Sequence, residues 1–434
     1  MLSKCSLAVN PSFQEEETAS WGRPFSFSDK ERILRQNGLW SKKGMRVLAL
    51  ACKPLKEEEI RDAKAENMIF LGLAAMTDPP KARSLKMAVA DAKKAGIRTV
   101  MITGDHKETA AAIASEIGIF TAGDLAVTGA DLDQMSDQQL QERLEKISVY
   151  ARVSPEHKIR IVEAWQKKGH ITAMTGDGVN DAPALKKADI GIAMGKAGTE
   201  VSRDAAAMIL TDDNFATIIK AVANGRNVYR NIKNSIQFLL SGNMAGILCV
   251  LYTSIKALPL PFAPVHLLFI NLLTDSLPAI AIGMEPADRD LLNQPPRDPK
   301  EGILSFPFAG KILFQGFLIG AATMWAWEMG YSQGGEAIAS TMAFSTLTLA
   351  RLFHGFNCRG RKSLLSLGIG SNLWCVMALF VGVVLMCAVL FVPKLQDVFA
   401  AGDLTGSQLL AVVLGALAPT AVIQIYKMMS AGTA

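Results

Sequence analysis

Two carboxylates that could hold a metal ion lie in the loop Thr-Gly-Asp-Gly-Val-Asn-Asp, residues 175–181. Asp177 and Asp181 are four residues apart, and glycines flank Asp177 on both sides. Carboxylate oxygens suit a hard divalent cation such as Mg²⁺, and glycine lets the backbone approach such an ion closely. An apolar run precedes the loop, and a helix-forming run that contains a proline follows it. The pattern favours a Mg²⁺ site over an ordinary turn with solvated acids.

A second loop of this kind, Thr103-Gly104-Asp105, follows the apolar run 97–102. From residue 82 to residue 210 strand patterns alternate with helix patterns, which is typical of a parallel, doubly wound sheet. Ligands bind to such sheets at the carboxyl ends of the strands, where both loops are expected. The sequence therefore predicts an α/β catalytic domain with the two loops at one edge of its sheet.

The elements that must position these loops can be bounded approximately. In the catalytic domain we expect strands at 97–102, 149–153, 171–174, 190–194 and 207–210, and helices at 84–95 and 156–168. Before it we expect an amphipathic helix at 29–39 and strands at 44–51 and 68–73.

The second half of the chain is far more apolar than the first. The chain has 434 residues, is 50% hydrophobic and has a mean hydropathy of +0.23, which is too apolar for an ordinary soluble protein of this size. Apolar stretches of about twenty residues, long enough to cross a bilayer as helices, begin after residue 230. We expect six spans, at about 235–255, 265–284, 309–329, 338–356, 373–392 and 408–426.

Charge places the catalytic domain in the cytoplasm and gives no sign of a nucleic-acid partner. The net charge is only +5, and the basic residues cluster just before the first span and in the loop that contains Arg359, Arg361 and Lys362. The loop at 328–340 has no Lys or Arg, so the positive-inside rule puts both chain ends on the cytoplasmic side. The six cysteines show no metal-binding or disulfide spacing, which indicates a reducing compartment.

Polar residues within the second span predict an ion site. Asn271, Thr274 and Asp275 have helical spacing that would place their oxygens on one face, and Asn243 in the first span could lie opposite them. Pro278 would loosen the helix beyond them. Buried polar groups in a membrane are costly and are functional by default, although a polar helix-packing cluster is the alternative. Such oxygen ligands suit a hard cation.

Nearly the whole chain resembles the carboxyl-terminal half of type II P-type cation-transporting ATPases, with calcium pumps the nearest group. The loop 175–181 with the following Ala-Pro is similar, almost letter for letter, to the hinge motif of that family. Asp78-Pro79-Pro80-Lys81 resembles its Asp-Pro-Pro-Arg segment, and Thr103-Gly104-Asp105 resembles its phosphate-site motif. Lys158, in Ser-Pro-Glu-His-Lys, matches its phosphate-contacting lysine.

The resemblance implies a fold, cofactors and residue roles. It implies a remnant of the nucleotide-binding domain at 1–75, a haloacid-dehalogenase-like phosphorylation domain at 76–230 and an all-α membrane domain of six helices at 231–434. Substrate ATP, Mg²⁺ and a transported Ca²⁺ follow from it. The implied phosphate-site residues are Thr103, Gly104, Asp105 and Lys158. Asp177 would ligate Mg²⁺, and Asn180 and Asp181 would support that ion or contact phosphate.

Two departures from the family pattern bear on the number of transported ions. Gly246 and Arg351 stand where the two-ion pumps of the family have glutamates. Arg351 would either place its guanidinium where a second ion would sit or extend toward the cytoplasmic loop. We favour the first interpretation, which predicts one ion per cycle.

The nucleophile of the family is missing from this sequence. No Asp-Lys-Thr-Gly-Thr run is present, and Asp29-Lys30 continues as Glu-Arg without a preceding buried strand. The resemblance also leaves out the first four spans, so the chain would be half a pump that is inactive by itself and needs an amino-terminal half as partner. The alternatives are an inactive truncated product and a non-catalytic membrane assembly partner. We expect a multi-pass protein in contact with lipid, in the plasma membrane of a bacterium.

Overall fold

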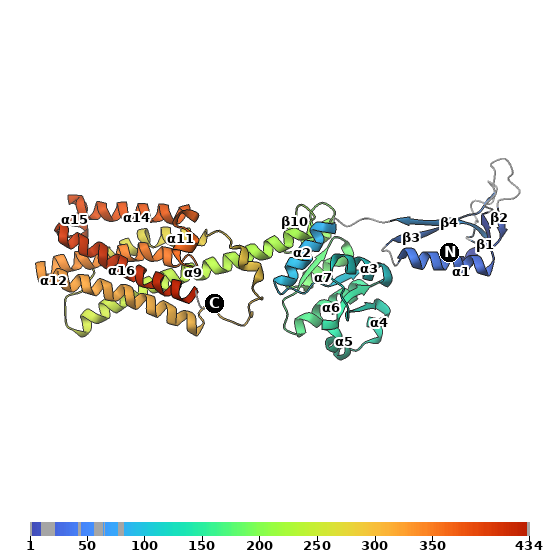
Figure 1. The fold of residues 1–434 in the computed structure, drawn as a ribbon, viewed down its shortest axis with the longest axis horizontal. Helices are drawn as coiled ribbons and strands as arrows, with labels where there is room; N and C mark the ends of the chain where they lie inside the picture. Colours follow the sequence, from blue (N-terminus) through green and yellow to red (C-terminus); the bar gives the residue numbers. More distant parts are fainter. Residues whose placement is uncertain are drawn as a thin grey trace. The chain divides into compact units, whose positions relative to one another are not determined.

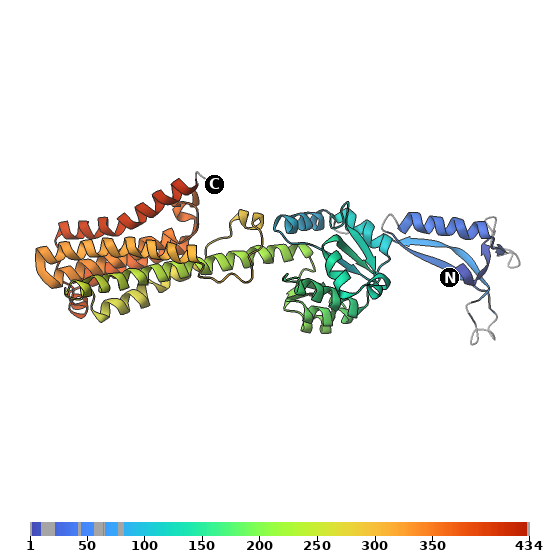
Figure 2. The same cartoon turned by 90° about the horizontal axis from the view of Figure 1, so that it is seen from below.

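The computed structural model describes residues 2–9, 22–41, 45–55, 64, 66–76 and 82–431. The chain forms two compact units, one of residues 1–221 and 292–295 and the other of residues 222–291 and 296–434. Figures 1 and 2 show the elements of each unit in two perpendicular views. The boundary lies close to the change from mixed to apolar composition in the sequence.

The first unit begins with a small sheet of four strands in the order β2-β1-β4-β3. Strands β3 and β4 form a long antiparallel pair, and helix α1 packs against these two strands (Figure 1). The bounds are β1 Cys5–Val9, β2 Gly22–Pro24, α1 Phe27–Ser41, β3 Arg46–Cys52 and β4 Met68–Met76, with a 3₁₀ turn at Leu2–Lys4. The expected helix and two strands are present, whereas β1 and β2 were not expected from the sequence pattern.

The rest of the first unit contains two parallel sheets of three strands each, β5-β7-β6 and β10-β9-β8. Their bounds are β5 Met101–Thr103, β6 Leu125–Thr128, β7 Ile147–Ala151, β8 Ala173–Gly176, β9 Ile190–Met194 and β10 Met208–Leu210. Ile102 of β5 packs both on the core of its own sheet and on the cluster around Met174 of β8. Side chains thus join the two sheets into one α/β layer.

Helices cover these parallel strands (Figure 1). They are α2 Ala82–Lys94, α3 Lys107–Ile117, α4 Gly129–Gln134, α5 Asp137–Arg143, α6 Pro155–Lys167, α7 Ala182–Lys187 and α8 Glu200–Ala205, with 3₁₀ turns at Leu144–Lys146 and Val179–Asp181. Ala110 and Ala114 of α3 pack on β7, and Val162 of α6 packs on Met174. The expected α/β order is confirmed, and β6, α4 and α5 add a connection that periodicity did not reveal.

The second unit is a bundle of apolar helices. It contains α9 Phe215–Ile255 from residue 222 on, α10 Pro264–Phe269, a π-helical turn Ile270–Thr274, α11 Ser276–Gly283, α12 Phe306–Asn357, α13 Leu364–Leu367, α14 Leu373–Phe391, α15 Pro393–Phe399 and α16 Gly406–Ala431, with 3₁₀ turns at Arg289–Asn293 and Ile369–Ser371. Among the described residues, five helices are long and apolar enough to cross a membrane. These five support a multi-pass membrane protein.

The difference between five such helices and six expected spans lies in α12, which has 52 residues. Gly335 interrupts it with a non-helical backbone at φ 72° and ψ −160°, a region that only glycine adopts readily. A Cβ on Gly330 would lie 2.8 Å from the Cα of Ala339, so the two halves of α12 fold back against each other. The expected spans at 309–329 and 338–356 are these two halves.

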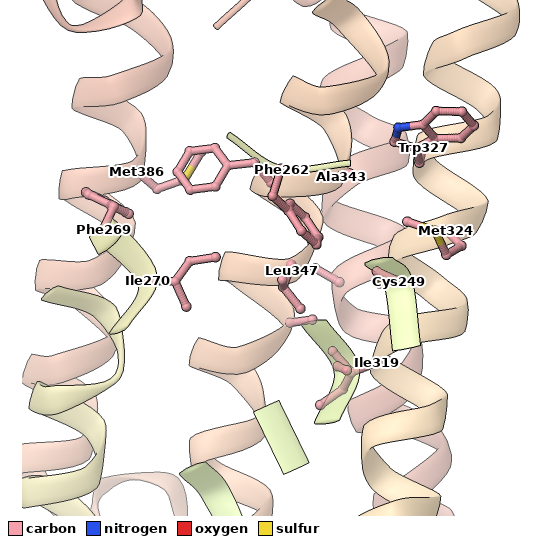
Figure 3. Packing of buried hydrophobic residues seen from close by; sticks show 14 of the residues in the cluster. Cys249, Phe262, Phe269, Ile270, Ile319, Met324, Trp327, Ala343, Leu347 and Met386 are labelled. Atoms are coloured by element: carbon pink, nitrogen blue, oxygen red, sulfur yellow. The ribbon is translucent and has the colours of Figure 1, made fainter. Parts of the chain in front are cut away.

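The core of the bundle is apolar and closely packed. Figure 3 shows its central cluster, to which α9, α12 and α14 contribute Cys249, Leu347 and Met386. Trp327 is buried in the same cluster. This cluster packs α9, the π-helical turn Ile270–Thr274 and the second half of α12 together, and these elements carry Asn243, Thr274 and Arg351.

Candidate functional site

The first candidate loop leaves the carboxyl end of β5. The Thr103 hydroxyl donates a hydrogen bond to Asp105 Oδ2 at 2.9 Å and accepts one from the Asp105 amide at 3.1 Å. The backbone of this loop also accepts the amide hydrogens of Arg152 and Val153, which follow β7. Nothing lies within 4 Å of the position that a Gly104 Cβ would take, so the loop leaves open space for a ligand.

Lys158 and Asp181 meet next to this loop. Lys158 lies in the first turn of α6, directly after the segment that contacts residues 103 and 105, and its Nζ donates to Asp181 Oδ1. Both side chains are largely buried. Asp181 Oδ2 accepts the amide hydrogens of Asp177 and Gly178 at 3.3 and 3.2 Å. Asp181 therefore fixes the 175–181 loop and ties it to the lysine.

Asp177 has the opposite character. It is exposed, as is Asn180, while Asp181 is buried. The backbone carbonyl of Asp177 accepts hydrogen bonds from the Thr199 amide at 2.8 Å and the Ser202 hydroxyl at 3.1 Å. The backbone is thereby held while the carboxylate stays accessible. Of the two predicted Mg²⁺ ligands, Asp177 is the one that an incoming ion can reach directly.

The turn that bears Lys158 is held by a cap. Ser154 is the N-cap residue of α6, and its hydroxyl accepts the His157 amide hydrogen at 3.4 Å. The Ser154 amide donates in return to His157 Nδ1 at 3.0 Å, which completes a capping box. His157 Nε2 lies 2.8 Å from Asp133 Oδ1 of α4. The sequence interpretation did not include His157 or Asp133, although the spacing Ser-x-x-His is that of a capping box.

In the second unit, the expected ion ligands lie where the second span departs from α-helical geometry. The π-helical turn Ile270–Thr274 separates α10 from α11, and the Asp275 amide donates to the Ile270 carbonyl at 2.9 Å. Such turns are rare and frequently occur at functional sites. Thr274 and Asp275 are buried, at 1% and 2% exposure. Asn271 is exposed, so it does not share the buried environment of Thr274 and Asp275, and its role as a ligand stays a prediction.

Arg351 is the principal partner of Asp275. Its Nη2 donates to Asp275 Oδ2 and also to Asn243 Oδ1, the latter at 3.1 Å. The guanidinium lies against the backbone of α9, where a Cβ on Gly242 would be 2.5 Å from Arg351 Nε. The side chain thus points at Asp275 and Asn243, two of the expected ion ligands, and not toward the loop that contains Arg361.

Two buried atoms at this site lack partners among the described residues, namely Asp275 Oδ1 and Arg351 Nε. A buried acceptor with no hydrogen bond is costly, and it commonly marks a place where an ion or water binds. On α9, nothing lies within 4 Å of the position that a Gly246 Cβ would take.

A second buried ion pair, which sequence reasoning missed, joins the end of α11 to the following loops. Arg359 donates from Nε and Nη2 to the two carboxylate oxygens of Glu285, both at 2.9 Å. Asn372 donates to Glu285 Oε2 at 2.7 Å, and Arg359 also contacts Ser371. The available signal was an acidic residue at the end of one span and an arginine at the end of another.

Two other sequence features have different outcomes. Asp78-Pro79-Pro80-Lys81 lies outside the described residues. Asp29 is held as a structural acid at the start of α1, where Arg23 makes two hydrogen bonds to it at 2.8 Å. The hydrogen bonds from Arg23, followed by the one from the Ser26 hydroxyl, keep the pKa of Asp29 below its ordinary value.

Comparisons with known proteins agree with this geometry. Residues 18–189 match the haloacid dehalogenase-like hydrolase family, residues 157–222 match a second family model of the same description, and residues 259–429 match the cation transporting ATPase C-terminus. The chain is 48% identical over 378 residues to calcium-transporting ATPase 1 of Lactococcus lactis, covering 86% of this chain and 42% of that protein.

More distant relatives carry similar names. The calcium-transporting ATPase of Bacillus subtilis is 41% identical, with 91% of this chain and 44% of that protein covered. The human calcium-transporting ATPase type 2C member 1 is 38% identical, with 83% and 38% covered. The chain therefore spans less than half the length of these relatives. Together the family matches place it in the P-type cation-transporting ATPases, as the counterpart of the carboxyl-terminal half of a type II pump.

Proposed function

We propose that the chain forms the phosphate-handling and cation-conducting part of an ATP-driven calcium pump. The observation that carries this proposal is the buried carboxylate of Asp275, which has one oxygen on Arg351 and no partner for the other among the described residues. A helical bundle that needed only packing would not keep an unsatisfied carboxylate at its centre. The names of the relatives, all calcium-transporting ATPases, support Ca²⁺ as the cargo.

The α/β domain has the groups that phosphoryl transfer needs. In such chemistry the protein mainly positions the phosphoryl group and neutralises its charge. The Thr103-Gly104-Asp105 loop would receive the phosphoryl oxygens, and Lys158 would supply a positive charge beside them. The exposed Asp177 fits a Mg²⁺ ion, which neutralises phosphate charge when bound. Asp181 is already bonded to Lys158 and two amides, so its role is to fix the loop, with Asn180 available at the surface.

The ion site has charge for one divalent cation. Asp275 is its carboxylate, and Asn243 and Thr274 add neutral oxygens nearby, while Asn271 would have to turn inward to contribute. The guanidinium of Arg351 neutralises Asp275 when no metal ion is bound, and it must move when one binds. A second divalent ion would then meet Arg351 and the bare backbone of Gly246, so we propose one ion per cycle. Mn²⁺ also suits these oxygen ligands and is the alternative cargo.

The phosphorylated aspartate would come from an amino-terminal half of the pump. No Asp-Lys-Thr-Gly-Thr run occurs in the sequence, so the chain by itself should form no acid-stable phosphoenzyme from ATP. The completed pump would lie in the plasma membrane of a bacterium, with the α/β domain in the cytoplasm and lipid around the bundle. The second candidate function is that of a non-catalytic membrane assembly partner, in which the same helices only pack against another protein.

A fusion experiment separates these two functions. The amino-terminal half of the Lactococcus lactis relative would be joined to this chain, and ATP-dependent ⁴⁵Ca²⁺ uptake would be measured in membrane vesicles. We expect uptake that is lost in Asp177→Asn and in Asp275→Asn, and competition by Mn²⁺. Phosphorylation with radiolabelled ATP is the second readout. Uptake that persists in both variants would refute the proposed sites, and a fusion that folds but neither phosphorylates nor transports would favour the assembly partner.

A further inference from the structure

The imidazole of His157 connects two helices beside the phosphate site. It is 14% exposed, next to Lys158 in the first turn of α6, and its edge packs against α4. A Cβ on Gly129, the first residue of α4, would lie 3.1 Å from both Cε1 and Nδ1 of the ring. The Arg152 carbonyl oxygen, 2.5 Å from that position, and the ring together occupy the space that the missing Gly129 side chain leaves, and α4 and α6 approach each other there.

The hydrogen bonds of this ring define one protonation state. A backbone amide can only donate, so Nδ1 must be unprotonated to accept from the Ser154 amide. An ionised carboxylate can only accept, so Nε2 must carry the hydrogen that is given to Asp133. The neutral form with its hydrogen on Nε2 satisfies both partners. A hydrogen on Nδ1 would remove the bond to the Ser154 amide.

We propose that His157 is a positioning residue for Lys158, acting as a neutral ring that fixes the first turn of α6 on α4. This inference rests on the proposed role of Lys158 at the phosphoryl group. Glu or Gln is the usual residue at this position of a capping box. Histidine differs from both because its ring has a second nitrogen, which can anchor a neighbouring helix while the first completes the box. The ring holds the first turn of α6 through Nδ1, bonded to Ser154, and through Nε2, bonded to Asp133. The fixed turn then holds Lys158 Nζ on Asp181. A frayed first turn would let the lysine leave the loop that bears Asp177.

The position of Lys158 can be measured on the full chain without any pump activity. A water-soluble carbodiimide joins a carboxylate to an amine only where the two are in contact, and peptide mass spectrometry quantifies the Lys158–Asp181 product. We expect His157→Ala to lower the initial rate of this cross-link by about fivefold or more, the factor that corresponds to loss of one good cap. His157→Gln keeps the capping box, as Gln139 does in α5, but loses the anchor to Asp133, so its rate should lie between those of the wild type and His157→Ala.

Gln139→Ala provides the matched control. It removes the third-position residue of the Ser136 capping box, in a helix of the same unit that does not bear Lys158, and it should leave the cross-link rate unchanged. Asp133→Ala removes the acceptor for His157 Nε2 without altering the capping box, and it should slow the cross-link. Asp133→Asn keeps an acceptor oxygen and should not slow it. A wild-type rate in His157→Ala, or a rate in His157→Gln as low as that in His157→Ala, would overturn the proposal.

Nitrogen NMR of the full chain in lipid, labelled at its five histidines, reads the protonation state directly. The signals that disappear in His157→Gln should be those of an unprotonated Nδ1 and a protonated Nε2 at neutral pH, and the opposite tautomer would overturn the assignment. Both measurements are independent of transport. If the fusion pump fails while the cross-link and the tautomer behave as expected, the proposed function is wrong and the positioning of Lys158 stands. If the pump works, its phosphorylation rate should fall in His157→Ala and recover in part in His157→Gln.

Discussion

Replacing Arg351 by Met should destabilise the bundle and at the same time make its stability depend on Ca²⁺. The side chains of Arg351 and Asp275 are only 4% and 3% exposed, and Asp275 Oδ1 has no partner among the described residues. The substitution therefore leaves a buried carboxylate without its countercharge. Breaking a buried pair in this way costs about 3–5 kcal/mol. For a unit of this size that corresponds to a fall in Tm of roughly 6–20 °C.

A divalent cation should restore most of this loss. Ca²⁺ at about 100 times its Kd stabilises a binding state by about 2.7 kcal/mol. In the wild type the same ion must first displace the guanidinium, so its stabilising effect should be much smaller. The assay is thermal unfolding of the detergent-solubilised chain, with chelator and with millimolar Ca²⁺, for wild type and Arg351→Met.

Arg359→Met is the matched control for this prediction. Arg359 is as deeply buried as Arg351 and is also paired with a carboxylate, but Glu285 keeps Asn372 as a donor and lies away from the expected ion ligands. The control should lose stability without gaining a response to Ca²⁺. An equal Ca²⁺ response in wild type and Arg351→Met, or an Arg351→Met variant as stable as the wild type, would refute the idea that Arg351 serves as the resident cation of the site.

Three further predictions concern single positions. Gly242→Ala places a methyl group 2.5 Å from Arg351 Nε, so it should push the guanidinium off Asp275 and give a Ca²⁺ response between those of wild type and Arg351→Met in the same thermal assay. Arg351→Glu alone should leave the fusion pump with one bound ion, whereas Arg351→Glu with Gly246→Glu, where a side chain has open space, should approach two in ⁴⁵Ca²⁺ equilibrium binding. The Asp213 carboxylate accepts hydrogen bonds from the backbone amides of residues 195–197, and these bonds, that of Lys196 first, lower its pKa. The ionised carboxylate therefore stabilises the α/β domain above about pH 4, the ordinary pKa of an aspartate. This stabilisation is lost as the pH falls through the lowered pKa. Asp213→Asn should thus lower the urea midpoint at pH 7 but not at pH 2, as followed by tryptophan fluorescence.

The sequence predicted those parts of the fold that local pattern controls. The strand-end positions of Thr103 and Asp177 follow from alternation of strands and helices, and the structure has them at the ends of β5 and β8. Strand β6 could not be anticipated because its four residues carry little pattern, and it is held by pairing with β7. The hairpin within α12 follows from hydropathy, although only the structure shows that a single glycine makes the turn.

The site was less predictable than the fold, because its contacts join residues that are far apart in sequence. Spacing alone suggested that Asn271 would lie beside Asp275, but it did not reveal that Asn271 is exposed while Asp275 is buried. The choice of Arg351 between the ion ligands and the cytoplasmic loop depends on the shape of the bundle, where a glycine at 242 makes room for a guanidinium. The ion pair of Glu285 with Arg359 was invisible for the same reason, since 74 residues separate the partners.

The π-helical turn at Ile270–Thr274 has a consequence for how related sequences are aligned. A turn of this kind holds one residue more than an α-helical turn, so loss of a single residue there would return the segment to an ordinary α-helix. Everything on the far side would then rotate by about 100° and advance by about 1.5 Å, which would turn Asp275 away from Arg351. Insertions and deletions at this point, more than substitutions, would therefore reorient the carboxylate. A one-residue gap between positions 270 and 274 in an otherwise similar chain would mark a protein whose membrane half no longer presents this acid to a cation.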